Sequence, residues 1–152
     1  MATETLRLTQ IASQVRRDIL RMVHKVNSGH PGGSLGCVEF FVSLYFSVME
    51  IKIPFSMNGK NEDIFFLSNG HICPVLYSTM AHAGYFPVSE LKTLRKFGSS
   101  LQGHPHREWL PMLENSSGPL GSGLSQTVGM ALADRIDNCK TSGRYFYCLL
   151  GD

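Results

Sequence analysis

The first part of the chain carries apolar residues at helical spacing. They recur at intervals of three and four residues, at Leu8, Ile11, Val15, Ile19, Met22 and Val26. This period places them on one stripe of a helix, with basic residues such as Arg17 and Arg21 mostly off the stripe. The pattern predicts an opening amphipathic helix that ends at Asn27-Ser-Gly29.

Three further segments also have helical character. Ser34 is a candidate N-cap for a helix that runs to about Met49, and the apolar residues of this segment lie all round it, which predicts a largely buried helix. Pro74 suits a first helical position, so another helix is expected from there through Ala83. A third is expected to begin near Ser89.

Two short apolar runs, residues 64–67 and 145–150, have the composition of buried strands. Residues 99–123 between them have no sustained period, which predicts a long loop of the kind that binds ligands. Helical spacing then resumes from Leu124 to Ile136. Because helices alternate with strands, the sequence predicts an α/β fold over residues 1–152, with a parallel sheet flanked by helices.

Composition excludes several classes of protein. With 152 residues, 43% of them hydrophobic and 17% charged, the chain has the size and balance of one globular domain. A net charge of +2 without a basic run argues against a nucleic-acid partner. No stretch reaches the roughly 18 apolar residues of a membrane span, and the opening residues lack a signal-peptide core. We therefore expect a cytoplasmic protein without a membrane partner.

The cysteines predict neither a zinc site nor a redox dithiol. Cys37, Cys73, Cys139 and Cys148 lie far apart and form no Cys-x-x-Cys pair. Free buried thiols are the simpler interpretation, and they suit a reducing compartment.

Three histidines lie in glycine-containing turns, and they are the main candidates for chemistry. His30 lies in Ser28-Gly-His-Pro-Gly-Gly33, His71 in Leu67-Ser-Asn-Gly-His71 and His104 in Gln102-Gly-His-Pro105. The glycines permit positive φ or close approach to a ligand, and the prolines stiffen two of the turns. A zinc pair at His104 and His106 is disfavoured by Pro105 and by the lack of acidic or cysteine partners nearby. The turns predict a polar pocket built from loops.

A glycine-rich segment, Gly118-Pro-Leu-Gly-Ser-Gly123, leads directly into the predicted helix that begins near Leu124. Its backbone can therefore pass close to a flat ligand, although the strict dinucleotide pattern Gly-x-Gly-x-x-Gly is absent. Gly151 and Asp152 follow the last apolar strand, where open α/β sheets place their ligands.

Taken in order and spacing, these segments resemble the amino-terminal, diphosphate-binding part of transketolase. The resemblance runs from about Leu8 to Asp152 and rests on five separated motifs. Two departures stand out: Ser122 replaces the usual glutamine of the glycine-rich loop, and the chain stops inside the family's Gly-Asp-Gly metal motif. The resemblance implies a thiamine-diphosphate enzyme that transfers two-carbon ketol units from ketose phosphates to aldose phosphates, as in the pentose phosphate pathway.

The resemblance also implies roles for individual residues. The glycine-rich loop would contact thiamine diphosphate through Gly118, Leu120, Gly121 and Gly123, together with Gly151. His71 would bind the diphosphate, whereas His30 and His104 would act on the substrate and the reaction intermediate as catalytic and substrate-binding residues. Asp152 would be a ligand of Mg²⁺ or another divalent cation. Because Mg²⁺ needs several oxygen ligands, the family adds a downstream asparagine, which this sequence does not contain.

Partners follow from the same resemblance. The family holds the aminopyrimidine in a second, carboxy-terminal domain or subunit, within a homodimer or a heterotetramer of split subunits. The chain is therefore expected to be a truncated amino-terminal part of a transketolase, or of its split amino-terminal subunit, and to be inactive alone. Two alternatives stay open: a related thiamine enzyme of the dihydroxyacetone synthase or deoxyxylulose phosphate synthase type, and a non-catalytic interaction module.

Overall fold

The computed structural model describes residues 2–55, 62–137 and 143–151. The chain divides into two compact units. Unit 1 contains Met1–Val48 and His71–Gly103, and unit 2 contains Met49–Gly70 and His104–Asp152. Cys139, one of the predicted thiols, and Asp152, the predicted metal ligand, lie outside the described residues.

Unit 1 opens with α1, Ala2–Val26, which confirms the predicted amphipathic helix and extends it toward the N-terminus. The predicted stripe is the packed face, because Val15 and Ile19 are fully buried and Met22 nearly so. Asp18 is also buried on this face, where its carboxylate contacts the imidazole Nε2 of His82 at 2.8 Å.

The predicted single helix from Ser34 to Met49 is wrong. The segment instead forms α2 (Pro31–Gly36), α3 (Val38–Ser43) and a π-helical turn, η1 (Leu44–Val48). Ser34 caps none of them, since it lies inside α2 and its hydroxyl donates to the carbonyl of Ile72 at 3.5 Å. Glycines are weak helix formers, and three of the six residues of α2 are glycine.

Burial along this segment is also less complete than predicted. Val38, Phe41, Leu44 and Tyr45 are buried, but Phe40 is 43% exposed and Val48 is 54% exposed. Only one side of the segment therefore packs into unit 1.

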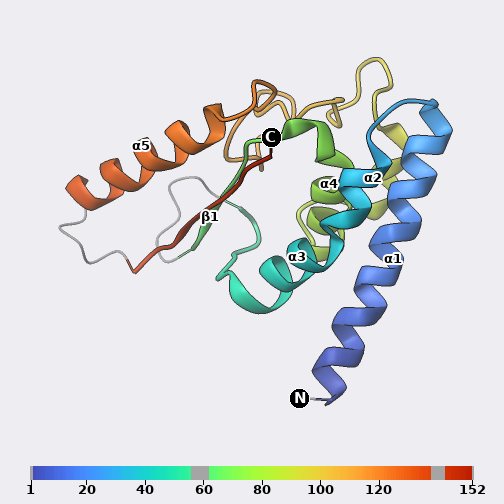
Figure 1. Ribbon diagram of the computed structural model, residues 1–152, viewed down its shortest axis with the longest axis horizontal. Coiled ribbons are helices and arrows are strands. Elements are labelled where there is room, and N and C mark those ends of the chain that lie inside the picture. Colours follow the sequence, from blue (N-terminus) through green and yellow to red (C-terminus); the bar gives the residue numbers. More distant parts are fainter. Residues whose placement is uncertain (1, 56–61, 138–142, 152) are drawn as a thin grey trace. The chain divides into compact units, whose positions relative to one another are not determined.

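The centre of unit 1 is α4, Cys73–Ala83, which has Pro74 near its start as predicted. It packs against α1, α2 and α3 (Figure 1). Nine of its residues are buried, so this helix is surrounded on nearly all sides. It ends at Gly84, whose φ of 97° gives the left-handed cap that glycine adopts without strain. The helix expected near Ser89 is a 3-10 helix, η3, Val88–Thr93.

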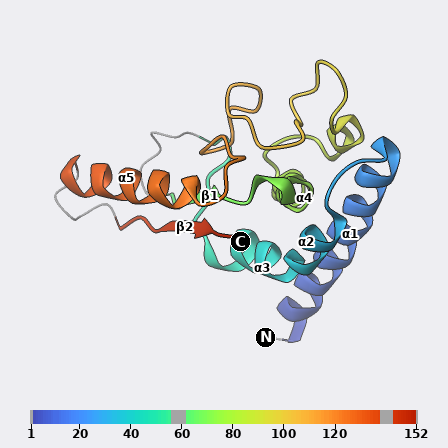
Figure 2. The same ribbon diagram turned by 45° about the horizontal axis from the view of Figure 1, so that its top comes forward.

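Unit 2 is built on two parallel strands, β1 (Ile64–Leu67) and β2 (Phe146–Leu149), as predicted. They pair in register from Ile64 with Phe146 to Leu67 with Leu149. Helix α5, Ser122–Asp137, lies against both strands (Figure 2). β1 is buried along its whole length, but β2 is only half-buried, which corrects the prediction of a second buried strand.

One carboxylate, that of Asp63, connects the segments that lead into β1 and β2. Asp63 accepts hydrogen bonds from the amides of Tyr145, at 2.8 Å, and Glu50, at 3.0 Å. The two strands therefore start at the same level and also end at the same level, where Ser68 donates its amide to the carbonyl of Leu149 at 2.9 Å. This shared end is the carboxyl edge at which parallel sheets bind ligands.

Within the described part of the chain, no helix has the length and apolar character needed to cross a membrane.

Candidate functional site

Two of the predicted histidines meet in unit 1. His30 directly precedes α2 and is exposed, and His71 lies in the short 3-10 turn η2, Gly70–Ile72. Their ring centroids are 5.0 Å apart with an interplanar angle of 63°, an edge-to-face contact. Two turns that are distant in sequence therefore present neighbouring imidazoles.

Close backbone packing holds these turns together. A Cβ atom on Gly33 would lie 2.8 Å from Cγ2 of Ile72, so glycine allows α2 to approach the turn that carries His71. The hydroxyl of Ser34 and the carbonyl of Ile72 contact each other at the same place. Gly33 in the motif of His30 therefore allows these two turns to pack closely.

In unit 2, Ser68 ties the glycine-rich loop to the end of β1. Its fully buried hydroxyl accepts hydrogen bonds from the amides of Gly121, at 3.0 Å, and Gly123, at 3.2 Å. A Cβ atom on Gly123 would lie 2.6 Å from the Cβ atom of Ser68, so only glycine fits there. Ser68 was not among the predicted site residues, although its place as the first polar residue after an apolar strand could have indicated it.

Gly151 lies beside the same strand end. A Cβ atom on Gly151 would be 2.9 Å from Cβ and Nδ2 of Asn69, and one on Gly70 would be 2.7 Å from Oγ of Ser117. Oδ1 of Asn69 and Oγ of Ser117 are buried, and neither has a hydrogen-bond partner among the described residues. Buried polar atoms nearly always have partners, so these two oxygens are suited to a polar ligand.

His104 is exposed and lies beside the glycine-rich loop within unit 2. Its Cδ2 atom is 4.0 Å from the position that a Cβ atom would take on Gly118. The neighbouring backbone is joined as well, since the amide of Ser117 donates to the carbonyl of Pro105 at 3.1 Å. The third histidine turn therefore contacts the start of the predicted cofactor loop.

A hydrogen bond within the glycine-rich loop stabilises the rest of its turn. Leu120 is half-exposed. Ser122 donates its hydroxyl to the carbonyl of Pro119 at 2.8 Å. The serine thus stabilises the turn itself.

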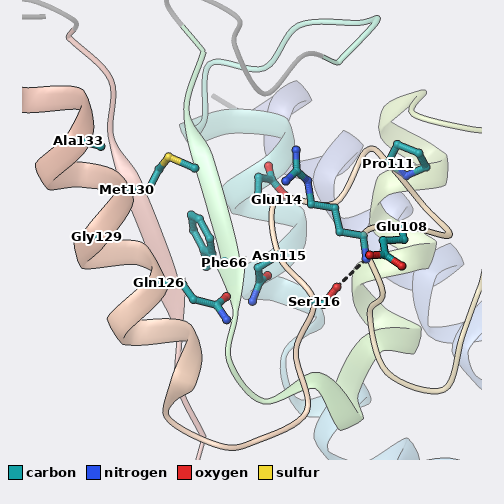
Figure 3. Close-up of a pocket in the computed structure, with 11 residues that line it drawn as sticks. Phe66, Glu108, Pro111, Glu114, Asn115, Ser116, Gln126, Gly129, Met130 and Ala133 are labelled. Carbon is teal, nitrogen blue, oxygen red and sulfur yellow. Dashed lines mark hydrogen bonds between the residues drawn. The ribbon is translucent and has the colours of Figure 1, made fainter. Parts of the chain in front are cut away.

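A separate groove of about 820 Å³ lies between α5 and residues 107–116, over strand β1 (Figure 3). Phe66 forms part of its wall, with Met130 and Gln126 on one side and Glu114 and Asn115 on the other. None of the predicted site residues lines it.

Glu114 is the unusual group in this groove. Burial raises the pKa of its carboxyl to about 8, and the nearby charge of Glu62 adds to the shift. The amide of Phe65 donates to Oε1 of Glu114 at 3.5 Å, and Nδ2 of Asn115 donates to the carbonyl of Leu67 at 3.2 Å. These side chains occupy the edge of β1 that β2 does not pair with, a structural role that sequence analysis did not identify.

The described part of the chain offers no metal cluster. Residues 2–55, 62–137 and 143–151 contain no group of three histidine, cysteine or acidic side chains that could hold a metal ion. Cys37, Cys73 and Cys148 are free, as predicted, although only Cys73 is fully buried. Burial raises the pKa of the Cys73 thiol to about 12, which leaves it protonated at neutral pH.

Comparison with known proteins gives one consistent result. Residues 8–152 match the family model described as transketolase, thiamine diphosphate binding domain. The chain is 37% identical over its full length to a Phocaeicola vulgatus protein that is one of the subunits of an apulose-4-phosphate transketolase, and it spans 52% of that protein. It is 36% identical to the chloroplastic transketolase of Spinacia oleracea, of which it spans 22%.

Solved structures agree with this assignment. The transketolase of Leishmania mexicana superimposes with a TM-score of 0.86 at 31% identity, over 95% of this chain and 23% of that one. The chain thus spans about half, or less, of the length of these relatives.

Proposed function

Because this chain belongs to the transketolase family, we propose that it forms the diphosphate-binding part of a thiamine-diphosphate-dependent transketolase. The complete enzyme would transfer a two-carbon ketol unit from a ketose phosphate to an aldose phosphate, as in pentose phosphate interconversion in the cytoplasm. The observation that carries the proposal is the match of residues 8–152 to the thiamine-diphosphate-binding domain. The relatives described above are named as transketolases, which does not favour another class of thiamine enzyme.

The described residues of unit 2 fit the polar end of the cofactor. Gly123 and Gly151 lie so close to Ser68 and Asn69 that a side chain on either would clash, and Asn69 and Ser117 each offer a buried oxygen without a partner among the described residues. Gly118 and Leu120 would complete the contacts from the glycine-rich loop. Since Ser68 already occupies the amides of Gly121 and Gly123, we expect these glycines to act by close approach.

The histidines divide the remaining work. His71 would donate to a diphosphate oxygen, and His30 and His104 would contact the substrate and exchange protons with its hydroxyls. Imidazole suits these tasks because its ordinary pKa lies near neutral pH. Thiamine diphosphate, when bound, would supply the electron sink for cleavage of the carbon–carbon bond. The chain's own residues would hold the cofactor and move protons.

The metal site is less complete than the cofactor site. Asp152 remains the proposed ligand of Mg²⁺, and Oδ1 of Asn69, next to Gly151, is the nearby described oxygen without a partner. Mg²⁺ prefers an octahedron of oxygen ligands, so these residues would hold it only together with diphosphate oxygens, waters or further protein ligands.

We also propose that the partner supplying the aminopyrimidine site is a carboxy-terminal transketolase domain or subunit, within a homodimer or a heterotetramer. Two observations support this proposal. The chain spans only 52% of the Phocaeicola protein and 22% of the Spinacia protein, and the Phocaeicola protein is named as one subunit of a transketolase.

Reconstitution tests the proposal. The purified chain is mixed with thiamine diphosphate, Mg²⁺, a ketose phosphate and an aldose phosphate, with and without a carboxy-terminal transketolase part. We expect ketol transfer only in the presence of that part. Transfer by the chain alone would contradict the need for a partner. If cofactor binding is absent in both mixtures, the chain is instead the non-catalytic interaction module.

A further inference from the structure

Arg95 has an unusual backbone conformation for its residue type. Its φ is +57°, in the left-handed region that side chains other than those of glycine and asparagine rarely adopt. Such strain costs about 1 to 3 kcal/mol and persists only where the surroundings fix it. The amide of Arg95 donates to the carbonyl of Leu101 at 2.8 Å, so the loop that leads to His104 fixes this residue.

The guanidinium of Arg95 joins two of the histidine turns. Nη1 donates to the hydroxyl of Ser28 at 3.0 Å, and Nη2 donates to the carbonyl of Gly103 at 3.2 Å. Ser28 lies two residues before His30, and Gly103 directly precedes His104. Both partners are neutral oxygens, and a forked guanidinium can contact two such groups at once in a fixed geometry.

Gly103 is shaped to receive this side chain. A Cβ atom there would lie 2.8 Å from Cζ of Arg95 and 2.9 Å from its Nε. That Nε is buried and has no hydrogen-bond partner among the described residues. The side chain is therefore pressed against the backbone of Gly103, in space that any residue larger than glycine would fill.

Helix α4, which follows the turn of His71, contacts the segment before His104 without Arg95. The thiol of Cys73 donates to the carbonyl of Gly103 at 3.2 Å, and the hydroxyl of Tyr77 donates to the carbonyl of Gln102 at 3.0 Å. Cys73 follows His71 by two residues, in the first turn of α4. The segment before His104 is thus held by α4 on one side and by Arg95 on the other.

We propose that Arg95 is a positioning residue for ketol transfer, holding the hydroxyl of Ser28, two residues before His30, and the carbonyl of Gly103, directly before His104, in one fixed arrangement. Its role in the reaction rests on the proposed function. Its role in holding the turns rests only on the contacts of unit 1.

The first test uses the assembled enzyme and the variant Arg95→Gly. Glycine adopts a positive φ without strain, so this substitution removes the side chain while relaxing the backbone, and thermal stability should change little. We expect kcat to fall on the order of 10²-fold, because small displacements of catalytic groups are costly. Cofactor affinity should stay close to that of the unmodified enzyme, since α4 holds the turn of His71. Arg95→Lys should recover only part of kcat, because an ammonium cannot span both oxygens.

A second readout does not need activity. In NMR spectra of the chain, Arg95→Gly should shift the ring signals of His30 and His104, and that of His71 through its contact with His30. His82, held by Asp18, is the internal reference and should not move. Arg17→Ala is the matched control, because this exposed cation contacts only its own helix, at Ser13 and Gln14, in the described structure. It should leave all these signals in place.

A third readout is the energetic coupling between positions 95 and 103, measured by combining substitutions at both. Gly103→Ala should disturb the signals of His30 and His104 strongly in the presence of Arg95, but add little in the Arg95→Gly background, where the new methyl meets no guanidinium. Equal effects of Gly103→Ala in both backgrounds, or unchanged histidine signals in Arg95→Gly, would overturn the positioning role. An unmodified assembly without ketol transfer would instead defeat the proposed function, while the NMR and coupling results still decide whether Arg95 holds the two turns.

Discussion

The imidazoles of His30 and His71 are in edge-to-face contact, with 5.0 Å between their ring centroids. One precedes α2 and the other lies in the turn before α4, so their contact depends on the packing of these two helices within unit 1. If His71 binds diphosphate as we propose, His30 is placed within reach of the atoms next to it. A substitution at either position should therefore change the environment of the other.

His71→Ala should weaken cofactor binding in the assembled enzyme. Loss of a charge-assisted hydrogen bond to diphosphate corresponds to about 1.5 to 3 kcal/mol, or about ten- to a hundredfold in affinity. His104→Ala should act mainly on the kinetics of the sugar substrates, because we propose that His104 contacts the substrate and not the diphosphate. Calorimetric titration with thiamine diphosphate and Mg²⁺ separates the two. Equal losses of cofactor affinity would show that these roles are wrongly divided.

Gly123→Ala should destabilise unit 2 by about 1 to 3 kcal/mol, the range for overpacking a tight interior site. The added methyl would lie 2.7 Å from Cα of Ser68, so the backbone itself must shift. Gly129→Ala is the matched control, because it lies in the same helix, and a Cβ atom there would meet nothing within 4 Å. Alanine should stabilise that position by roughly 0.5 to 1 kcal/mol.

Urea unfolding of both glycine variants measures the difference. If Gly123→Ala is as stable as Gly129→Ala, then the contact between Ser68 and the glycine-rich loop is looser than described. Ser68→Ala should give an intermediate loss, since it removes the acceptor of two amides without adding volume.

The stability of unit 2 should fall as pH rises toward 8. Burial raises the pKa of Glu114 to about 8, so the folded chain keeps this carboxyl protonated at pH values where the unfolded chain has released the proton. The stabilisation is complete below the ordinary pKa of a glutamate, and it is lost at up to about 1.4 kcal/mol per pH unit until the folded pKa is passed.

Glu114→Gln should flatten this dependence, because glutamine has no proton to release. Glu108→Gln is the control, since Glu108 belongs to the same loop but is exposed. Melting temperatures of the three proteins from pH 5 to pH 8 provide the measurement. A Glu114→Gln profile as steep as that of the unmodified chain would assign the pH dependence to another group.

The chain should self-associate through α5. This helix carries a row of apolar side chains that are about half-exposed or more, at Leu124, Val128, Leu132 and Ile136. Contiguous exposed apolar surface favours association. Leu132→Glu should shift the chain toward monomers in light scattering, whereas Ser125→Glu, at another exposed position of α5, should not. Monomers of the unmodified chain at high concentration would contradict the prediction.

The sequence by itself determined the elements whose pattern is local. The period of three and four residues in α1, the apolar run of β1 and the proline at the start of α4 each predicted their element. The sequence also predicted the parallel α/β arrangement and the membership of the transketolase family, because both follow from the order of motifs along the chain. The prediction of one continuous helix from Ser34 was wrong, because packing against α1 and α4 decides whether this segment forms α-helical, π-helical or turn conformations.

Tertiary structure alone decided which residues support these motifs. The place of Ser68 after an apolar strand does not reveal its partner, because its hydroxyl becomes the acceptor of two amides only when the glycine-rich loop folds back onto the end of β1. Glu114 looks like any loop glutamate until the groove removes it from water. Arg95 follows a short 3-10 helix without any motif, but its guanidinium reaches Ser28 and Gly103, which are far apart in sequence. Pairings of this kind depend on distances between segments that only the folded chain brings together, because local spacing carries no information about them.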